Sequence, residues 1–270
     1  MSGVVSTWRA GRLEPREGCD LHPARIAVAD SWLVDDGRAL AIDLHRERFL
    51  GALPPAFESL DPAGFWDAAL RSIGREGARF PRVEARWAAA SARAAPGEWR
   101  PQLLLRERPA PELRRAIRLW THPGPDPRTE PRTKGPDLEA LLRLRTAAQA
   151  AGTEEAVILE PDGAVADGST TCLVWWLGDA LAIPDPDIPR VDSVTLRSLA
   201  GLATALGVEV LPDRRGPEEL DGLEVWALNA LHGPRIVTGW VDGPATAEQP
   251  GRLEAWRRRL SALRKPLPLG

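Results

Sequence analysis

The chain has 270 residues, of which 43% are hydrophobic, so it can bury one large or two medium-sized cores. A formal net charge of −3 argues against a nucleic-acid partner, and no apolar run approaches the ~18 residues of a membrane-spanning helix. The N-terminal segment has no hydrophobic signal core and two cysteines cannot build a disulfide framework, so we expect a cytoplasmic protein without a membrane partner.

Residues 1–121 predict a small α/β domain. Apolar and charged residues alternate in its strand-like segments, which is typical of a sheet with one face in water. The tripeptide Asp35-Asp36-Gly37 predicts a hairpin turn, and a helix is expected to start within 43–53. Further elements are expected as strands at 4–8, 26–34, 39–44, 83–90, 99–106 and 115–121, and as a helix at 62–73.

Residues 122–133 contain four prolines and no periodicity, which predicts a linker between two domains. The second domain then spans 134–270. Because ligand sites often lie between domains, we expect the functional site in an interdomain cleft. The second domain should contain helices at 138–151, 193–206 and 252–263, and strands at 156–159, 171–177, 180–183 and 224–230.

Lys134 begins this second domain and is one of only two lysines, the other being Lys265 near the frayed end. Fourteen helical residues after Lys134 advance about 21 Å, and the following strand returns about 20 Å. If the strand runs back along the helix, Asp167 can lie beside Lys134. The plain alternative is a structural ion pair or two solvated side chains.

The segment AGTEEAVILEPDGAVADGSTTCLVWW resembles the centre of the class IV aminotransferases, with Lys134 and Asp167 at the family's spacing. These are fold-type IV pyridoxal-phosphate enzymes, including branched-chain and D-amino-acid aminotransferases and 4-amino-4-deoxychorismate lyase. The resemblance extends loosely over residues 25–243. It implies an α+β fold with a small α/β domain and a larger β-barrel-like domain with flanking helices. It also implies a homodimer and an amino substrate.

The resemblance implies that Lys134 forms an aldimine with pyridoxal 5'-phosphate and that Asp167 holds the ring nitrogen. His45 stands eight residues after Gly37, as in the family's H-x-x-R motif, which places Arg48 where the phosphate-binding arginine sits. Without this match, Arg48 would be interpreted as an exposed arginine on a helix.

Three further positions follow from the resemblance. Ser193, Val194 and Thr195 match a phosphate-binding turn at a helix start, although Ser193 is also a plausible helix cap. Ala230 and Leu231 match cofactor contacts. Weaker assignments to the substrate are Asp30, Ser31, Asn229 and His232.

The family pattern is broken at Asp167, which replaces a glutamate, at Gly135-Pro136-Asp137 and at Leu196. The predicted reaction is amino-acid transamination or release of pyruvate from 4-amino-4-deoxychorismate to give 4-aminobenzoate. Asn229-Ala230-Leu231 is similar to the lyase branch. The alternative is a cofactor-free relative that acts as a binding or structural protein.

Other chemistries have weaker signals. No G-x-S-x-G elbow supports a serine hydrolase. Cys19 and His22 form a C-x-x-H pair, but two ligands do not make a zinc site, so no metal is predicted.

Overall fold

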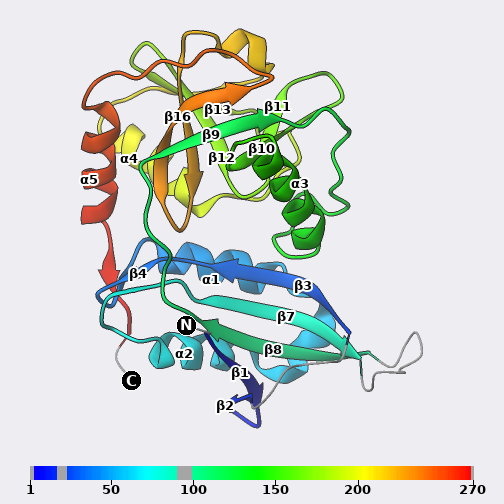
Figure 1. Ribbon diagram of the computed structural model, residues 1–270. Helices are drawn as coiled ribbons and strands as arrows, with labels where there is room; N and C mark the ends of the chain where they lie inside the picture. The colour runs from blue at the N-terminus through cyan, green and yellow to red at the C-terminus, as the bar shows by residue number, and fades with distance from the viewer. Residues whose placement is uncertain (1–2, 17–22, 90–98, 269–270) are drawn as a thin grey trace. The chain divides into compact units, whose positions relative to one another are not determined.

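The computed structural model describes residues 3–16, 23–89 and 99–268. The chain forms two compact units (Figure 1). Unit 1 contains Met1–Glu112, Thr133–Pro136 and Arg264–Gly270, and unit 2 contains Leu113–Arg132 and Asp137–Leu263. The α+β fold expected from the sequence is confirmed.

Unit 1 is built on an antiparallel sheet with the strand order β2-β1-β8-β7-β3. Two helices, α1 (Ile42–Gly51) and α2 (Pro62–Ser72), and the 3-10 turn η1 (Pro55–Leu60) accompany it. The strands are β1 (Val4–Arg9), β2 (Arg12–Pro15), β3 (Ala24–Ser31), β7 (Arg82–Ala89) and β8 (Trp99–Glu107). A small second sheet joins β4 (Val34–Asp35), β5 (Arg38–Ala39), β6 (Ala78–Arg79) and β17 (Lys265–Pro266).

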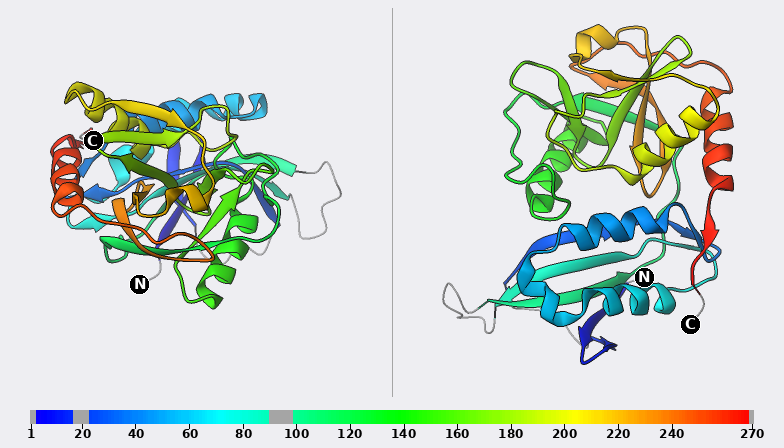
Figure 2. Two further views of the ribbon diagram at one scale, coloured as in Figure 1. Left: turned by 90° about the horizontal axis from the view of Figure 1, so that it is seen from above. Right: turned by 180° about the vertical axis from the view of Figure 1, so that it is seen from behind.

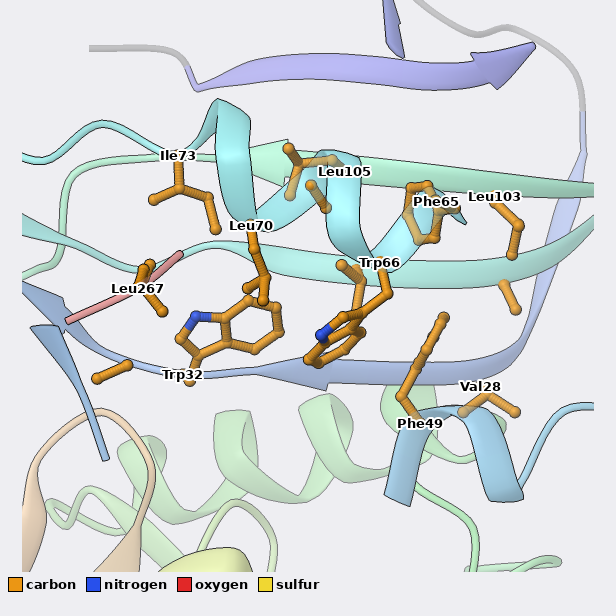
Figure 3. Close-up of a cluster of buried hydrophobic side chains, with 14 of the residues drawn as sticks. Val28, Trp32, Phe49, Phe65, Trp66, Leu70, Ile73, Leu103, Leu105 and Leu267 are labelled. Carbon is orange, nitrogen blue, oxygen red and sulfur yellow. The ribbon is translucent and has the colours of Figure 1, made fainter. Parts of the chain in front are cut away.

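Aromatic side chains form the core of unit 1 (Figure 3). The ring centroids of Trp32 and Trp66 are 5.0 Å apart, and those of Phe49 and Trp66 are 5.8 Å apart. Phe65 packs on the same cluster from α2. Because such rings bury large areas and prefer tilted contacts, this cluster fixes α1 and α2 with respect to the sheet.

Unit 2 contains an eight-stranded mixed sheet, in the order β11-β10-β9-β16-β15-β12-β13-β14, that curls around an apolar core (Figure 2). Its helices are α3 (Leu138–Ala150), α4 (Val194–Ala205), α5 (Arg252–Ala262) and the 3-10 turn η2 (Pro217–Leu220). Its strands are β9 (Ala116–Thr121), β10 (Glu155–Leu159), β11 (Val165–Gly168), β12 (Cys172–Leu177), β13 (Ala180–Pro184), β14 (Val210–Asp213), β15 (Glu224–Asn229) and β16 (Gly233–Val241).

The chain crosses between the units at other residues than we expected. The strand at 115–121 does not complete unit 1; as β9 it pairs in parallel with β10 and β16 of unit 2. Residues 122–132 also belong to unit 2 and contain the buried side chain of Arg128. The proline-rich segment is therefore not a linker but is ordered by side-chain hydrogen bonds. Proline removes backbone donors but does not prevent packing.

The expected strand at 39–44 is also corrected. Pairing ends at Ala39, and α1 begins at Ile42 after Ala41 takes a left-handed conformation with φ 47°. The predicted turn is confirmed, since Asp36 and Gly37 both have positive φ. Among the described residues, none of the helices has both the length and the apolar character needed to cross a membrane.

Candidate functional site

Lys134 lies in unit 1, where its backbone is attached to β3. The carbonyl oxygen of Lys134 accepts a hydrogen bond from the backbone N–H of Ala29 at 2.7 Å. Gly135 makes this approach possible: it has φ 144°, and a Cβ there would lie 2.9 Å from both the Ala29 nitrogen and the Val28 Cα. In the sequence, Gly135 was a departure from the family pattern; α3 begins three residues later, at Leu138.

Arg48 is held by Asp30 in a side-on pair within the same unit. Its Nε lies 2.9 Å from Oδ2 of Asp30, and its Nη2 lies 2.6 Å from Oδ1. Asp30 also accepts from the backbone N–H of Ser31 at 2.6 Å and from Nδ1 of His45 at 2.9 Å. The side chain of Asp30 has no exposed surface, so, among the described residues, its carboxylate bonds only to the groups of this cluster.

The neighbouring charges in this cluster shift the pKa values of Asp30 and His45. Burial alone would raise the pKa of the Asp30 carboxyl, but His45 and Arg48 outweigh burial and hold that pKa below its usual range. Burial lowers the pKa of His45 against the opposing pull of Asp30, and the charges of Arg48 and Lys134 lower it further. The Lys134 charge therefore acts on the Asp30–His45–Arg48 cluster, and unit 1 brings three predicted residues, Asp30, Arg48 and Lys134, together with His45.

Asp167 is a predicted cofactor-binding residue in unit 2. It lies on β11, its carboxylate is buried, and its Oδ2 lies 3.5 Å from Nη1 of Arg128. Its Oδ1 has no hydrogen-bond partner in the described part of the chain. Burial raises the pKa of Asp167 to about 7, although Arg128 and Arg190 oppose the shift. A buried carboxylate oxygen without a donor is costly and indicates a position for a ligand N–H.

Arg128 reaches Asp167 because Asp126 fixes its guanidinium. Nε of Arg128 lies 3.0 Å from Oδ1 of Asp126, and its Nη2 lies 2.8 Å from Oδ2. Asp137, at the start of α3, accepts from the backbone N–H groups of Thr129 and Glu130 at 2.9 Å each. These bonds order the proline-rich segment from within.

The N-terminus of α4 carries the predicted phosphate-binding residues Ser193, Val194 and Thr195. The Oγ of Ser193 accepts from the N–H of Leu196 at 3.3 Å, so the expected cap is present. The first-turn N–H groups, including those of Val194 and Thr195, have no carbonyl partner within the helix, and the helix dipole makes this end positive. This arrangement can bind an anion such as a phosphate.

The turn between β15 and β16 carries further predicted residues. Oδ1 of Asn229 accepts from the N–H of His232 at 2.8 Å, so Asn229 shapes the turn that contains Ala230 and Leu231. Nδ1 of His232 accepts from the N–H of Arg114 at 3.2 Å. Burial, followed by the nearby arginines, lowers the pKa of His232 to about 4, so the ring is neutral near pH 7.

Sequence reasoning missed His45, Arg128 and Asp126 as members of the site. The H-x-x-R spacing included His45, but its bond to Asp30 depends on the fold. Arg128 stood in a segment read as a linker, and nothing in the sequence distinguishes it from neighbouring arginines. Lys134 and Asp167 belong to different units, and their proximity remains a prediction. Cys19 and His22 lie outside the described residues.

The fold and these clusters define a two-unit α+β protein with a lysine, a buried carboxylate and a helix N-terminus of the kind that can bind an anion. The family model for amino-transferase class IV matches residues 27–240, and the chain belongs to this family.

Solved structures give the same fold at low identity. A branched-chain aminotransferase from Thermoproteus uzoniensis, solved with norvaline, is 16% identical with a TM-score of 0.78; the match covers 97% of this chain and 96% of that one. A branched-chain amino acid aminotransferase of T.th., complexed with N-(5'-phosphopyridoxyl)-L-glutamate, is 18% identical, with 99% and 98% covered and a TM-score of 0.78. The fold IV-transaminase CpuTA1 of Curtobacterium pusillum is 18% identical, with 96% and 97% covered and a TM-score of 0.75. A search of curated proteins found no match.

Proposed function

We propose that this protein is a pyridoxal-phosphate-dependent enzyme that acts on an amino substrate, by transamination or by 4-amino-4-deoxychorismate lyase chemistry. The observation that carries the proposal is Oδ1 of Asp167, a buried carboxylate oxygen that lacks a donor among the described residues. A protonated pyridine nitrogen is a donor of the right charge. Binding it would favour the ionised form of a carboxyl group whose pKa burial raises to about 7.

The remaining residues fit the same cofactor. Arg48, held side-on by Asp30, would present its guanidinium to the phosphate oxygens. Ser193, Val194 and Thr195 would hold the phosphate at the start of α4. Ala230 and Leu231 would contact the cofactor from the β15–β16 turn, with Asn229 and His232 nearer the substrate.

Lys134 would hold the cofactor covalently through its side-chain amine. The bound cofactor supplies an electron sink that stabilises negative charge on the substrate Cα. Once released by the substrate, the amine of Lys134 in its neutral form would move the Cα proton as a general base. Asp167 would keep a positive charge on the ring nitrogen, and Asp30 would keep Arg48 oriented.

Transamination and lyase chemistry use the same residues in this proposal. Ala230 has no hydroxyl at a position where aminotransferases often place one, and Asn229-Ala230-Leu231 resembles the lyase branch. This favours pyruvate release from 4-amino-4-deoxychorismate. A homodimer in the cytoplasm is proposed from the family resemblance.

The experiment supplies the purified protein with pyridoxal phosphate and measures two products. Pyruvate and 4-aminobenzoate from 4-amino-4-deoxychorismate would establish the lyase, and keto acid formation from amino donors would establish the transaminase. Asp167→Asn should abolish either activity, whereas Asp43→Asn, on the exposed first turn of α1, should not. Absence of cofactor binding would contradict the proposal and leave a cofactor-free relative of the family.

A further inference from the structure

Arg235 is buried in unit 2 without a side-chain partner among the described residues. It lies on β16 opposite Ala227 of β15, and only 5% of its surface is exposed. Its guanidinium makes no hydrogen bond or ion pair with any residue that the structure describes, and its Nε is buried. A largely buried guanidinium whose Nε has no acceptor costs stability, and an anion that bonds to it would offset that cost.

Two carboxylates lie near Arg235, but both are bonded elsewhere. Glu155 accepts from the hydroxyls of Ser169 and Thr170, and from the N–H of Thr170 at 3.0 Å. Glu154 accepts from the N–H of Arg118 at 2.8 Å and forms an ion pair with Arg114 at 3.6 Å. Neither carboxylate comes within ion-pair distance of Arg235. The simpler explanation, a buried Arg–Glu ion pair, is therefore not supported.

Charges of both signs act on Arg235. Burial, the largest cause, lowers the pKa of Arg235 to about 10; Glu155 and Glu154 oppose this shift, and Arg145 and Arg114 add to it. Arg257 donates to the carbonyl oxygens of His232, at 2.8 Å, and Pro234, which adds a third guanidinium to the same turn. Like charges gathered around a buried charge repel one another, and a bound anion would remove that cost.

His232 lies near Arg235 and carries no charge near pH 7. Its Nδ1 accepts from the backbone N–H of Arg114, so the proton of the neutral ring is on Nε2. The ring therefore presents a neutral donor among the arginines. Such a combination binds oxygen anions and does not favour a cation.

We propose that Arg235, with Arg145 and His232 nearby, is a binding site for an oxyanion, either a carboxylate or a phosphate-like group. The planar guanidinium matches the paired oxygens of these anions. The anion could be a second carboxylate of the substrate or a separate anionic ligand. The site does not rest on the proposed function, because anion binding is measured without turnover.

The test measures the thermal unfolding midpoint of the full chain, saturated with pyridoxal phosphate so that the phosphate site is filled. Succinate and sulfate are titrated against chloride at constant ionic strength. We expect a saturable rise in the midpoint for the wild type, and at least about tenfold weaker anion binding in R235M and R145Q. R143Q is the matched control, because Arg143 is on the same helix but pairs with Glu139.

R235M also distinguishes an unpartnered Arg235 from an Arg235 that is the counter-charge of Glu155. An unpartnered buried charge predicts that R235M is more stable than the wild type in chloride, whereas a counter-charge to Glu155 predicts that it is less stable. Lower stability of R235M, no anion-dependent rise in the wild type, or equal anion binding in R145Q and R143Q would each overturn the site. If the chain binds no pyridoxal phosphate, the same titration is run without it, so failure of the proposed function stays distinguishable.

The source of the anion is found from kinetics of R145Q. A higher KM for dicarboxylic amino donors, with no change for monocarboxylic donors, assigns the site to the substrate. Unchanged KM values together with lost anion stabilisation assign it to a separate ligand.

Discussion

Replacing Asp167 by asparagine should stabilise the cofactor-free protein at pH 8. Burial raises the pKa of Asp167 from 3.8 to about 7, and three units at about 1.4 kcal/mol each amount to about 4 kcal/mol. Because the folded pKa is the higher one, this group's stabilising contribution is complete below pH 3.8 and is lost as the pH rises to about 7. Asparagine carries no charge at any of these pH values and removes the loss.

The assay is urea unfolding of the cofactor-free protein at pH 4, 6 and 8. We expect Asp167→Asn to exceed the wild type by up to about 4 kcal/mol at pH 8 and to match it near pH 4. The variant should also bind pyridoxal phosphate more weakly, because Oδ1 becomes part of an amide. Asp126→Asn is the control for loss of a carboxylate beside Arg128, and it should not flatten the pH profile in the same way. Equal pH dependence in Asp167→Asn and the wild type would refute the reasoning.

Two further predictions concern unit 1. Asp30→Asn breaks a buried pair with Arg48 and should lower the free energy of unfolding by about 3 to 5 kcal/mol. Asp30→Asn should also weaken binding of pyridoxal phosphate but not of pyridoxal, which lacks the phosphate. Asp43→Asn is the exposed control. Equal losses of affinity for pyridoxal phosphate and pyridoxal would contradict the role of Arg48. Gly135→Ala places a Cβ 2.9 Å from backbone atoms at φ 144° and should cost about 2 to 5 kcal/mol in urea unfolding. Gly152→Ala, which has positive φ but open space, should cost only about 1 to 2 kcal/mol, and a similar cost at both positions would show that Gly135 has no tight contact.

Local patterns predicted the local elements. The helix expected at 62–73 is α2, and the hairpin strands expected at 83–90 and 99–106 are β7 and β8. These elements have strong periodicity, and their neighbours in sequence are also their neighbours in the fold. The same reasoning placed 115–121 in the wrong unit, because the partners of β9 are 35 or more residues away in β10 and β16.

The candidate site was predictable where spacing carried information. Lys134, Arg48 and Asp167 followed from matched spacing, and Ser193 followed from its position before an apolar helical pattern. Asp30 was expected near the substrate, whereas its carboxylate is occupied by Arg48 and His45. Pairings of this kind depend on side chains that meet only after the sheet and α1 have packed, and a chain with 33 arginines offers many alternatives.

Arg128 and Arg235 show the same limit. Both are buried, one fixed by Asp126 and the other without a partner among the described residues, and neither differs in sequence from exposed arginines close by. Burial of a charge depends on the whole unit, so it has no local signal.

The most direct test of the central claim is borohydride reduction of the purified protein with pyridoxal phosphate, followed by its visible spectrum and peptide mass mapping. With only two lysines in the chain, the matched pair of variants is Lys134→Ala and Lys265→Ala. The account predicts a visible cofactor band in the wild type and in Lys265→Ala, a single reduced adduct on the Lys134 peptide, and neither signal in Lys134→Ala. An adduct that persists in Lys134→Ala, or no band at saturating cofactor, would contradict the account.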